Sequence, residues 1–166
     1  MTVKLLMSAC LIGQCCRYDA QNGKSIVTPK LHKMLNNGEV AVICPELAGG
    51  LGVPRDPCEI ASGGTAAGVL DGAAKVLSIK SEDKTESFIK GARATLELVQ
   101  KYSIKTAVMK EGSPSCGVHS VHNGAFDGKL VEGRGVTAEL LARNGVRVFS
   151  EDELESAIQY AEQQAL

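Results

Sequence analysis

Three cysteines that are far apart in the sequence, Cys10, Cys44 and Cys116, each follow a short apolar run. Cys10 and Cys44 come directly after such a run, and Cys116 lies seven residues past another. Short apolar runs bounded by turn residues are typical of buried strands. If these strands are parallel neighbours, their carboxyl ends meet at one edge of a sheet, where ligands bind in folds of this kind. The spacing therefore predicts a pocket that contains three thiols.

Three convergent thiolates favour an iron–sulfur cluster over a structural zinc ion. Structural zinc sites usually have four ligands, often in CxxC turns, and this sequence contains no CxxC. A cluster with three protein ligands leaves one iron open, and an open iron is a Lewis acid with affinity for sulfur. Two alternatives stay open from the residues alone: a zinc site, and cysteines that are simply small buried residues.

A fourth thiol lies near the first. Cys16, in SACLIGQCCRYD, can replace one of the three cysteines as a ligand or act as a sulfur-handling group. Cys15 beside it is expected to point elsewhere. Cys58, in PRDPCE, is interpreted as a bystander, because nothing in its spacing brings it to the strand ends.

Polar residues near these cysteines are candidates for acid–base chemistry. Glu46 is two residues past Cys44, so in an extended continuation its carboxylate would face the same side as the thiol, which makes it the best general-base candidate. Ser113 and Ser115 come just before Cys116, and their hydroxyls can orient a heteroaromatic ring or a water molecule. The alternative is that they bond to their own backbone, as serines in turns commonly do.

Other charged and titratable residues have weaker indications. Arg17 and Arg55 can bind an anionic substrate or cluster, although a structural ion pair is the simpler expectation. His119 and His122 follow Cys116 and can support that site from outside, with solvent-facing loop histidines as the alternative.

Alternating strands and amphipathic helices must position these groups. Residues 3–9, 40–43, 106–109 and 146–149 are the predicted strands. Helices are expected after Thr28-Pro29, over the stripe from Phe88 to Val99, before Asn144-Gly145, and after a capping box made by Ser150 and Glu153. A small hairpin is expected about Asp71-Gly72, and the glycine-rich segment after Met109 is expected to be a long functional loop. The pattern predicts one α/β domain over residues 1–166, a mostly parallel sheet with helices on both faces in a Rossmann-like three-layer arrangement.

Composition excludes several other classes. The chain has 166 residues and a formal charge of −1, so no net positive field would hold a nucleic-acid polymer or an anionic membrane. No secretory signal and no transmembrane run is recognisable, so a cytoplasmic protein with reduced thiols is expected. The sequence also lacks GxSxG, HExxH, a P-loop and a strand-anchored GxGxxG. It leaves the oligomeric state open.

Four segments together resemble the DUF523 family, which includes the thiouracil desulfidases. They are SACLIGQCCRYD, CPELAGGLGVPRDPCEI, KEGSPSCG and GVTAELLARNGVRVFSE, and they extend over nearly the whole chain. The resemblance implies a Rossmann-like domain that binds an oxygen-sensitive [4Fe–4S] cluster through three cysteines. On this chain it implies Cys10, Cys44 and Cys116 as ligands.

The same resemblance implies roles for other residues. Glu46 and Ser113 would form the catalytic polar pair. Cys16 also belongs to the matched motif, so the choice of three ligands from four stays open, and the adjacent Cys15 is a departure that complicates the assignment.

The expected reaction is a non-redox, hydrolytic desulfuration of thiolated pyrimidines such as thiouracil, with release of sulfide. The partner would be a small thiolated heterocycle. The alternatives are a sulfur carrier or trafficking protein that uses Cys16, and a zinc-binding or metal-free binding module.

Overall fold

A four-stranded parallel sheet forms the centre of the protein. The computed structural model describes residues 2–20 and 25–165. The strands lie in the order β2 (Val40–Ile43), β1 (Leu5–Ser8), β5 (Thr106–Met109) and β8 (Arg147–Ser150), and every neighbouring pair is parallel. The predicted α/β architecture is therefore confirmed. The carboxyl ends of all four strands point to the same edge of the sheet.

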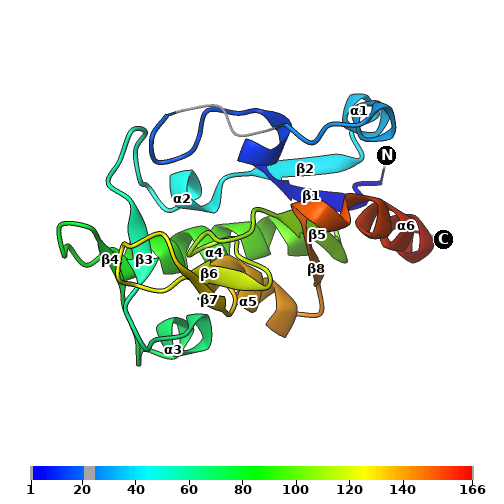
Figure 1. Ribbon diagram of the computed structural model, residues 1–166. Coiled ribbons are helices and arrows are strands. Elements are labelled where there is room, and N and C mark those ends of the chain that lie inside the picture. The colour runs from blue at the N-terminus through cyan, green and yellow to red at the C-terminus, as the bar shows by residue number, and fades with distance from the viewer. Residues whose placement is uncertain (1, 21–24, 166) are drawn as a thin grey trace.

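Helices cover both faces of this sheet (Figure 1). On one face lie α1 (Pro29–Asn36) and α6 (Leu154–Gln164), and on the other lie α4 (Thr85–Lys101) and α5 (Val136–Arg143). The three-layer arrangement predicted from the sequence is present, with the sheet as the middle layer.

Side chains of the central strand β1 alternate between the two helical layers. Leu5 and Met7 belong to the core that includes α1 and α6, and Leu6 belongs to the core that includes α4 and α5. All three are fully buried. Because both faces of a parallel sheet are covered, its strands consist of continuous apolar runs, which is why they were recognisable in the sequence.

Smaller elements gather beyond the carboxyl ends of the strands, on the left in Figure 1. Two antiparallel pairs lie there, β3 (Cys58–Ile60) with β4 (Val76–Ser78), and β6 (Ser120–His122) with β7 (Leu130–Glu132). The remaining short elements are η1 (Ala9–Ile12), α2 (Pro45–Ala48), α3 (Ala66–Leu70) and η2 (Glu151–Glu153). The long segment after Met109 therefore contains a hairpin, β6–β7, as well as loop.

The hairpin expected about Asp71-Gly72 is wrong. The residues before Asp71 form α3, which begins where the Thr65 side chain accepts a hydrogen bond from the Gly68 backbone N–H. Gly72 then adopts the left-handed conformation that ends the helix, with φ of 82°. The residues expected to form the first strand of the hairpin are therefore helical, stabilised by capping and by local hydrogen bonds. The strand that follows, β4, pairs with β3 instead.

Two glycines allow α2 to pack directly on α4. A methyl group on Gly91 of α4 would collide with the Pro45 carbonyl oxygen, and one on Gly49 would collide with the Ser87 carbonyl oxygen. The two backbones are therefore in direct contact. This contact fixes α2, and with it the residues on either side of Pro45.

We expect Gly91→Ala to destabilise the protein by about 1–3 kcal/mol, because the added methyl group must push α2 away from α4. The measurement is the midpoint of urea unfolding, followed by circular dichroism. Gly52→Ala is the matched control, since a methyl group there meets nothing within 4 Å. Equal midpoints for the two variants would contradict the proposed backbone contact.

None of the helices in the described part of the chain is both long enough and apolar enough to span a lipid bilayer.

Candidate functional site

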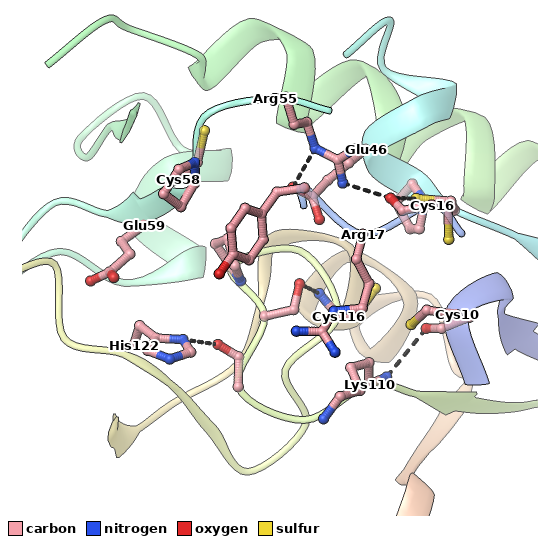
Figure 2. A pocket seen from close by; sticks show the side chains of 18 of the residues that line it. Cys10, Cys16, Arg17, Glu46, Arg55, Cys58, Glu59, Lys110, Cys116 and His122 are labelled. Atoms are coloured by element: carbon pink, nitrogen blue, oxygen red, sulfur yellow. Dashed lines mark hydrogen bonds and ion pairs between the residues drawn. The ribbon is translucent and has the colours of Figure 1, made fainter. Parts of the chain in front are cut away.

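A cavity of about 410 Å³ lies at the carboxyl ends of the sheet strands. Strand β1 contributes its last residue, Ser8, and the segments that follow β1, β2 and β5 contribute the rest of one wall. Five cysteines line the cavity, Cys10, Cys16, Cys44, Cys58 and Cys116. Figure 2 shows Cys10, Cys16 and Cys116 on one side of the cavity, with Cys58, Glu59 and His122 on the opposite side.

Each cysteine reaches the cavity from a different element. Cys10 lies in η1, directly after β1, and Cys44 is the residue that precedes the first turn of α2. Cys116 lies in the loop after β5. Cys16 follows a turn at Gly13, whose φ of 92° reverses the chain. The strand ends thus bring together the three cysteines expected from the sequence, and the η1 turn adds the fourth.

The loop that carries Cys116 is held from two directions. One oxygen of Glu111 accepts hydrogen bonds of 2.8 Å from the backbone N–H groups of Val118, His119 and Ser120. The first N–H groups of α5 donate to the carbonyl oxygens of Pro114 and Ser115. The first backbone N–H groups of a helix have no acceptor within the helix, and here the carbonyl oxygens of the cysteine loop accept from them. These hydrogen bonds fix the backbone of the loop against α5.

Burial of Glu111 alone would raise the pKa of its carboxyl group. The three backbone donors outweigh burial and hold the pKa below its ordinary value. Glu111 is therefore a charged anchor for the cysteine loop.

All the thiols that show a shifted pKa are shifted upward. Burial raises the pKa of Cys116 to about 12. The Cys10 thiol raises the pKa of Cys16, and contact with Cys16 together with burial raises the pKa of Cys44. The thiols of Cys16, Cys44 and Cys116 are therefore protonated in the metal-free protein, and binding of a metal group must release their protons.

Two hydroxyl groups act on the Cys116 sulfur. The Ser115 Oγ lies 3.3 Å from the Cys116 Sγ, and the Ser8 hydroxyl also lowers the pKa of this thiol. The Ser8 Oγ accepts a hydrogen bond from the Lys110 backbone N–H. Hydroxyls that donate to a sulfur stabilise its charged form. Sequence reasoning missed Ser8, although its place at the end of β1, beside the end of β5, was a usable signal.

Glu46 lies in the first turn of α2 and not in an extended continuation of β2, so the expected route to the cavity is wrong. Pro45 begins the helix immediately after Cys44. The Glu46 side chain nevertheless lines the same cavity as the thiols and is only 18% exposed. Burial raises the pKa of Glu46, although the Arg55 guanidinium partly offsets this effect.

Arg55 connects Glu46 to the segment that carries Cys16. Its Nε lies 3.5 Å from Glu46 Oε1, and its Nη2 donates a 3.0 Å hydrogen bond to the Cys16 carbonyl oxygen. The Arg55 side chain is only 8% exposed. The Nε makes no hydrogen bond, so its attraction to Glu46 is mainly electrostatic. The expected structural ion pair is present, and it lies inside the cavity wall.

Ser113 uses its hydroxyl oxygen to organise the turn before Cys116. Its Oγ accepts hydrogen bonds of 3.1 Å from the backbone N–H groups of Ser115 and Cys116. This is the backbone-bonding role that the sequence left as an alternative. Because an oxygen that accepts twice still carries its own hydrogen, the Ser113 hydroxyl can also donate into the cavity that it lines.

Cys58 also lines the cavity, so the expectation that it stays apart from the strand ends is wrong. Strand β3 folds back over the strand ends and carries Cys58 and Glu59 to the opposite wall. Glu59 Oε1 accepts hydrogen bonds from the backbone N–H groups of Gly124 and Phe126, which holds the facing loop in place. Sequence spacing contained no signal for this pairing, because α3 lies between β3 and β4 in the chain.

The two loop histidines differ in position. His122 lines the cavity, and its Nδ1 lies 2.8 Å from the Gly112 carbonyl oxygen. His119 is exposed and pairs with Glu153 at 2.9 Å outside the cavity, which raises the pKa of His119.

The cavity suits an anionic cluster with thiolate ligands. All six cysteines lie in the described ranges and none forms a disulfide, so the four on one wall are chemically available. Arg17, Arg55 and Lys110 line the same cavity and offset negative charge. Among residues 2–20 and 25–165, no three His, Cys, Asp or Glu side chains surround a single ion position.

Comparisons with known proteins agree on one family. The family model described as 2-thiouracil desulfurase matches residues 5–153. The uncharacterized protein YbbK of Bacillus subtilis (strain 168) is 43% identical over 150 residues, which cover 90% of this chain and 97% of that protein. The solved structure of the [4Fe-4S]-dependent thiouracil desulfidase TudS (DUF523Vcz) is 38% identical, with a TM-score of 0.85, covering 96% of this chain and 97% of that one.

Proposed function

Since this chain belongs to the 2-thiouracil desulfurase family, we propose that it is a [4Fe–4S]-dependent thiouracil desulfidase, an enzyme that cleaves the carbon–sulfur bond of a thiolated pyrimidine. The solved relative TudS is named for this cofactor and this activity. The reaction that we propose is a hydrolysis, without net oxidation or reduction.

Cys10, Cys44 and Cys116 would hold the cluster. Each lies in the segment that follows a strand of the sheet, β1, β2 or β5. The Ser8 and Ser115 hydroxyls beside Cys116 favour the charged form of its thiol. When bound through three cysteines, the cluster supplies an open iron that attracts the thiocarbonyl sulfur and polarises the carbon–sulfur bond.

Glu46 would act as the general base. Its carboxylate takes a proton from water, and the water oxygen bonds to the carbon that carries the sulfur. The carbon–sulfur bond then breaks, the sulfur leaves with the bonding electron pair, and protonation gives hydrogen sulfide and the oxo-pyrimidine. The raised pKa of Glu46 suits this role, because a base works best when its pKa approaches the working pH.

Ser113 would position the ring or relay a proton. Its oxygen is held by two backbone donors, so its position is fixed while its hydrogen stays available. The neighbouring Ser115 hydroxyl, 3.4 Å away, extends the same path towards Cys116.

One observation carries the proposal: three thiols from separate strand ends and a half-buried carboxylate line one cavity. A structural zinc site usually has four ligands, often in CxxC turns, and the sequence contains no CxxC. The thiols without disulfides fit a reducing compartment, so we place the enzyme in the cytoplasm and treat residues 1–166 as one desulfidase domain.

Anaerobic reconstitution tests the function. The loaded protein is incubated with 2-thiouracil in H₂¹⁸O, and sulfide and uracil are measured together. We expect equal amounts of both products, with the heavy oxygen incorporated into uracil. A fully loaded protein that releases no sulfide from any thiolated nucleobase would reject the activity, and unlabelled uracil would reject hydrolysis.

The pH profile provides a prediction for Arg55. In Arg55→Met the charge that lowers the pKa of Glu46 is lost, so the base is ionised only at higher pH. The acid limb of kcat/KM for sulfide release should therefore move upward by about 1–3 pH units. Arg143→Met is the control, because its partner Asp71 lies on the surface far from the cavity residues. An unmoved acid limb in Arg55→Met would show that Glu46 is not the titrating base.

A further inference from the structure

Cys16 is a fourth thiol in a site that needs three. It is only 4% exposed, and it lines the cavity together with Cys10, Cys44 and Cys116. Its thiol interacts with the thiols of both Cys10 and Cys44, and the Cys44 Sγ also lies 3.9 Å from the Cys16 carbonyl oxygen. Cys16 therefore lies within the cluster pocket, between two of the proposed ligands.

The buried Cys16 differs from Cys10 and Cys116 in its relation to the apolar cores. Cys116 belongs to the core that includes α4 and α5, and Cys10 packs against the core that includes α1 and α6. Cys16 belongs to none of the three apolar cores formed by the described residues. A buried cysteine outside these apolar cores and beside two other thiols points to a role for its sulfur.

The backbone around Cys16 differs from that of the other three cysteines. Cys10, Cys44 and Cys116 lie in η1, at the start of α2, and in a loop bonded to α5. Cys16 lies in the segment between Gly13 and Ala20, outside every helix and strand. The long side chain of Arg55 bonds to its carbonyl oxygen. Cys16 therefore belongs to no element of the sheet layers, so a rotation of its side chain requires no change in the sheet.

We infer that Cys16 is an exchangeable fourth ligand, which occupies the open iron when no substrate is present and is displaced by the thiocarbonyl sulfur. This inference rests on the proposed function. On ligation the Cys16 thiol gives up its proton. On displacement the iron–sulfur bond to Cys16 breaks, a bond to the substrate sulfur forms, and the released thiolate takes a proton back. Nothing is oxidised or reduced.

The exchange would protect the cofactor. Mild oxidation of a four-iron cluster most readily removes the iron that has no cysteine ligand. A thiolate bound to that iron would slow its loss. It also costs substrate affinity, because the substrate must first replace an existing ligand.

The test compares the reconstituted wild type with Cys16→Ala and Cys16→Ser, and uses Cys15→Ser as the matched control, since Cys15 is the adjacent, exposed cysteine. Samples are treated anaerobically with limiting ferricyanide, and formation of the three-iron cluster is followed by electron paramagnetic resonance. We expect the Cys16 variants to bind a complete cluster but to lose one iron about ten- to a hundredfold faster than the wild type. Cys15→Ser should behave like the wild type.

Two results would overturn the inference. Equal rates of iron loss in all four proteins would show that Cys16 does not cover the open iron. A failure of both Cys16 variants to take up iron, with an unchanged circular dichroism spectrum, would make Cys16 one of the three permanent ligands. Sulfide release from 2-thiouracil is measured on the same samples. If none is released, the proposed function fails, while the rates of iron loss still decide whether Cys16 is a ligand.

Discussion

Replacing Cys10, Cys44 or Cys116 with serine, one at a time, is expected to abolish assembly of the four-iron cluster and all sulfide release. Each thiol reaches the cavity from a different part of the chain, and Cys16 is assigned to the iron that these three leave open, so it is not expected to replace a lost sulfur. Serine keeps the approximate size of the side chain but is a poor ligand for iron that otherwise prefers thiolates. The measurement is iron and sulfide content after anaerobic reconstitution, together with the visible absorption of the cluster.

Two cysteines serve as controls for these variants. Cys15→Ser changes an exposed thiol, and Cys58→Ser changes a thiol on the opposite wall of the same cavity. Both should bind the full complement of iron. If any of the three main variants also did so, the set of permanent ligands would have to be revised, with Cys16 as the first candidate to replace that residue.

Glu46→Gln is expected to lower kcat by about 10²–10⁴-fold, the usual contribution of a general base. Glutamine retains the shape of the side chain but cannot accept a proton from water. The cluster should load normally, because Glu46 is not among its proposed ligands. Iron content and the initial rate of sulfide release, measured on one sample, separate loss of catalysis from loss of cofactor.

The pH dependence identifies the role of Glu46 more sharply. The raised pKa of this carboxyl group means that the wild type loses its base as the pH falls, beginning above the ordinary glutamate range. The residual activity of Glu46→Gln should lack this acid limb. Glu86→Gln, on the exposed side of α4, is the control and should retain both the rate and the pH profile. A Glu46→Gln enzyme with nearly wild-type kcat would exclude this residue as the base.

Much of the fold could be predicted because it depends on local patterns. Apolar runs in the sequence correspond to β1, β2, β5 and β8. The capping box was equally visible, since the Glu153 carboxylate accepts a hydrogen bond from the Ser150 backbone N–H. The hairpin about Asp71-Gly72 was wrong because an apolar stretch next to Asp-Gly also suits a short helix with a glycine end.

The gathering of thiols followed from one topological rule, that parallel strands end at the same edge of a sheet. What could not be predicted depends on contacts between distant segments. The pairing of β3 with β4 carries Cys58 to the far wall, and the fold brings Arg55 against both Glu46 and the Cys16 carbonyl oxygen. No sequence spacing specifies these contacts, because they arise only when separate loops pack over the strand ends.

The pKa values of Glu46, which lines this cavity, and Glu111, which anchors its cysteine loop, are shifted in opposite directions. The pKa of Glu46 is raised, so its charge is lost early on acidification, whereas the pKa of Glu111 is lowered, so its hold on the cysteine loop persists until the solution is more acidic. The stability that Glu111 contributes is present above the ordinary glutamate pKa and is lost only as the pH falls through its lower folded value. Moderate acidification should therefore remove the charge of the base while the cysteine loop stays anchored, so that activity falls before the protein unfolds.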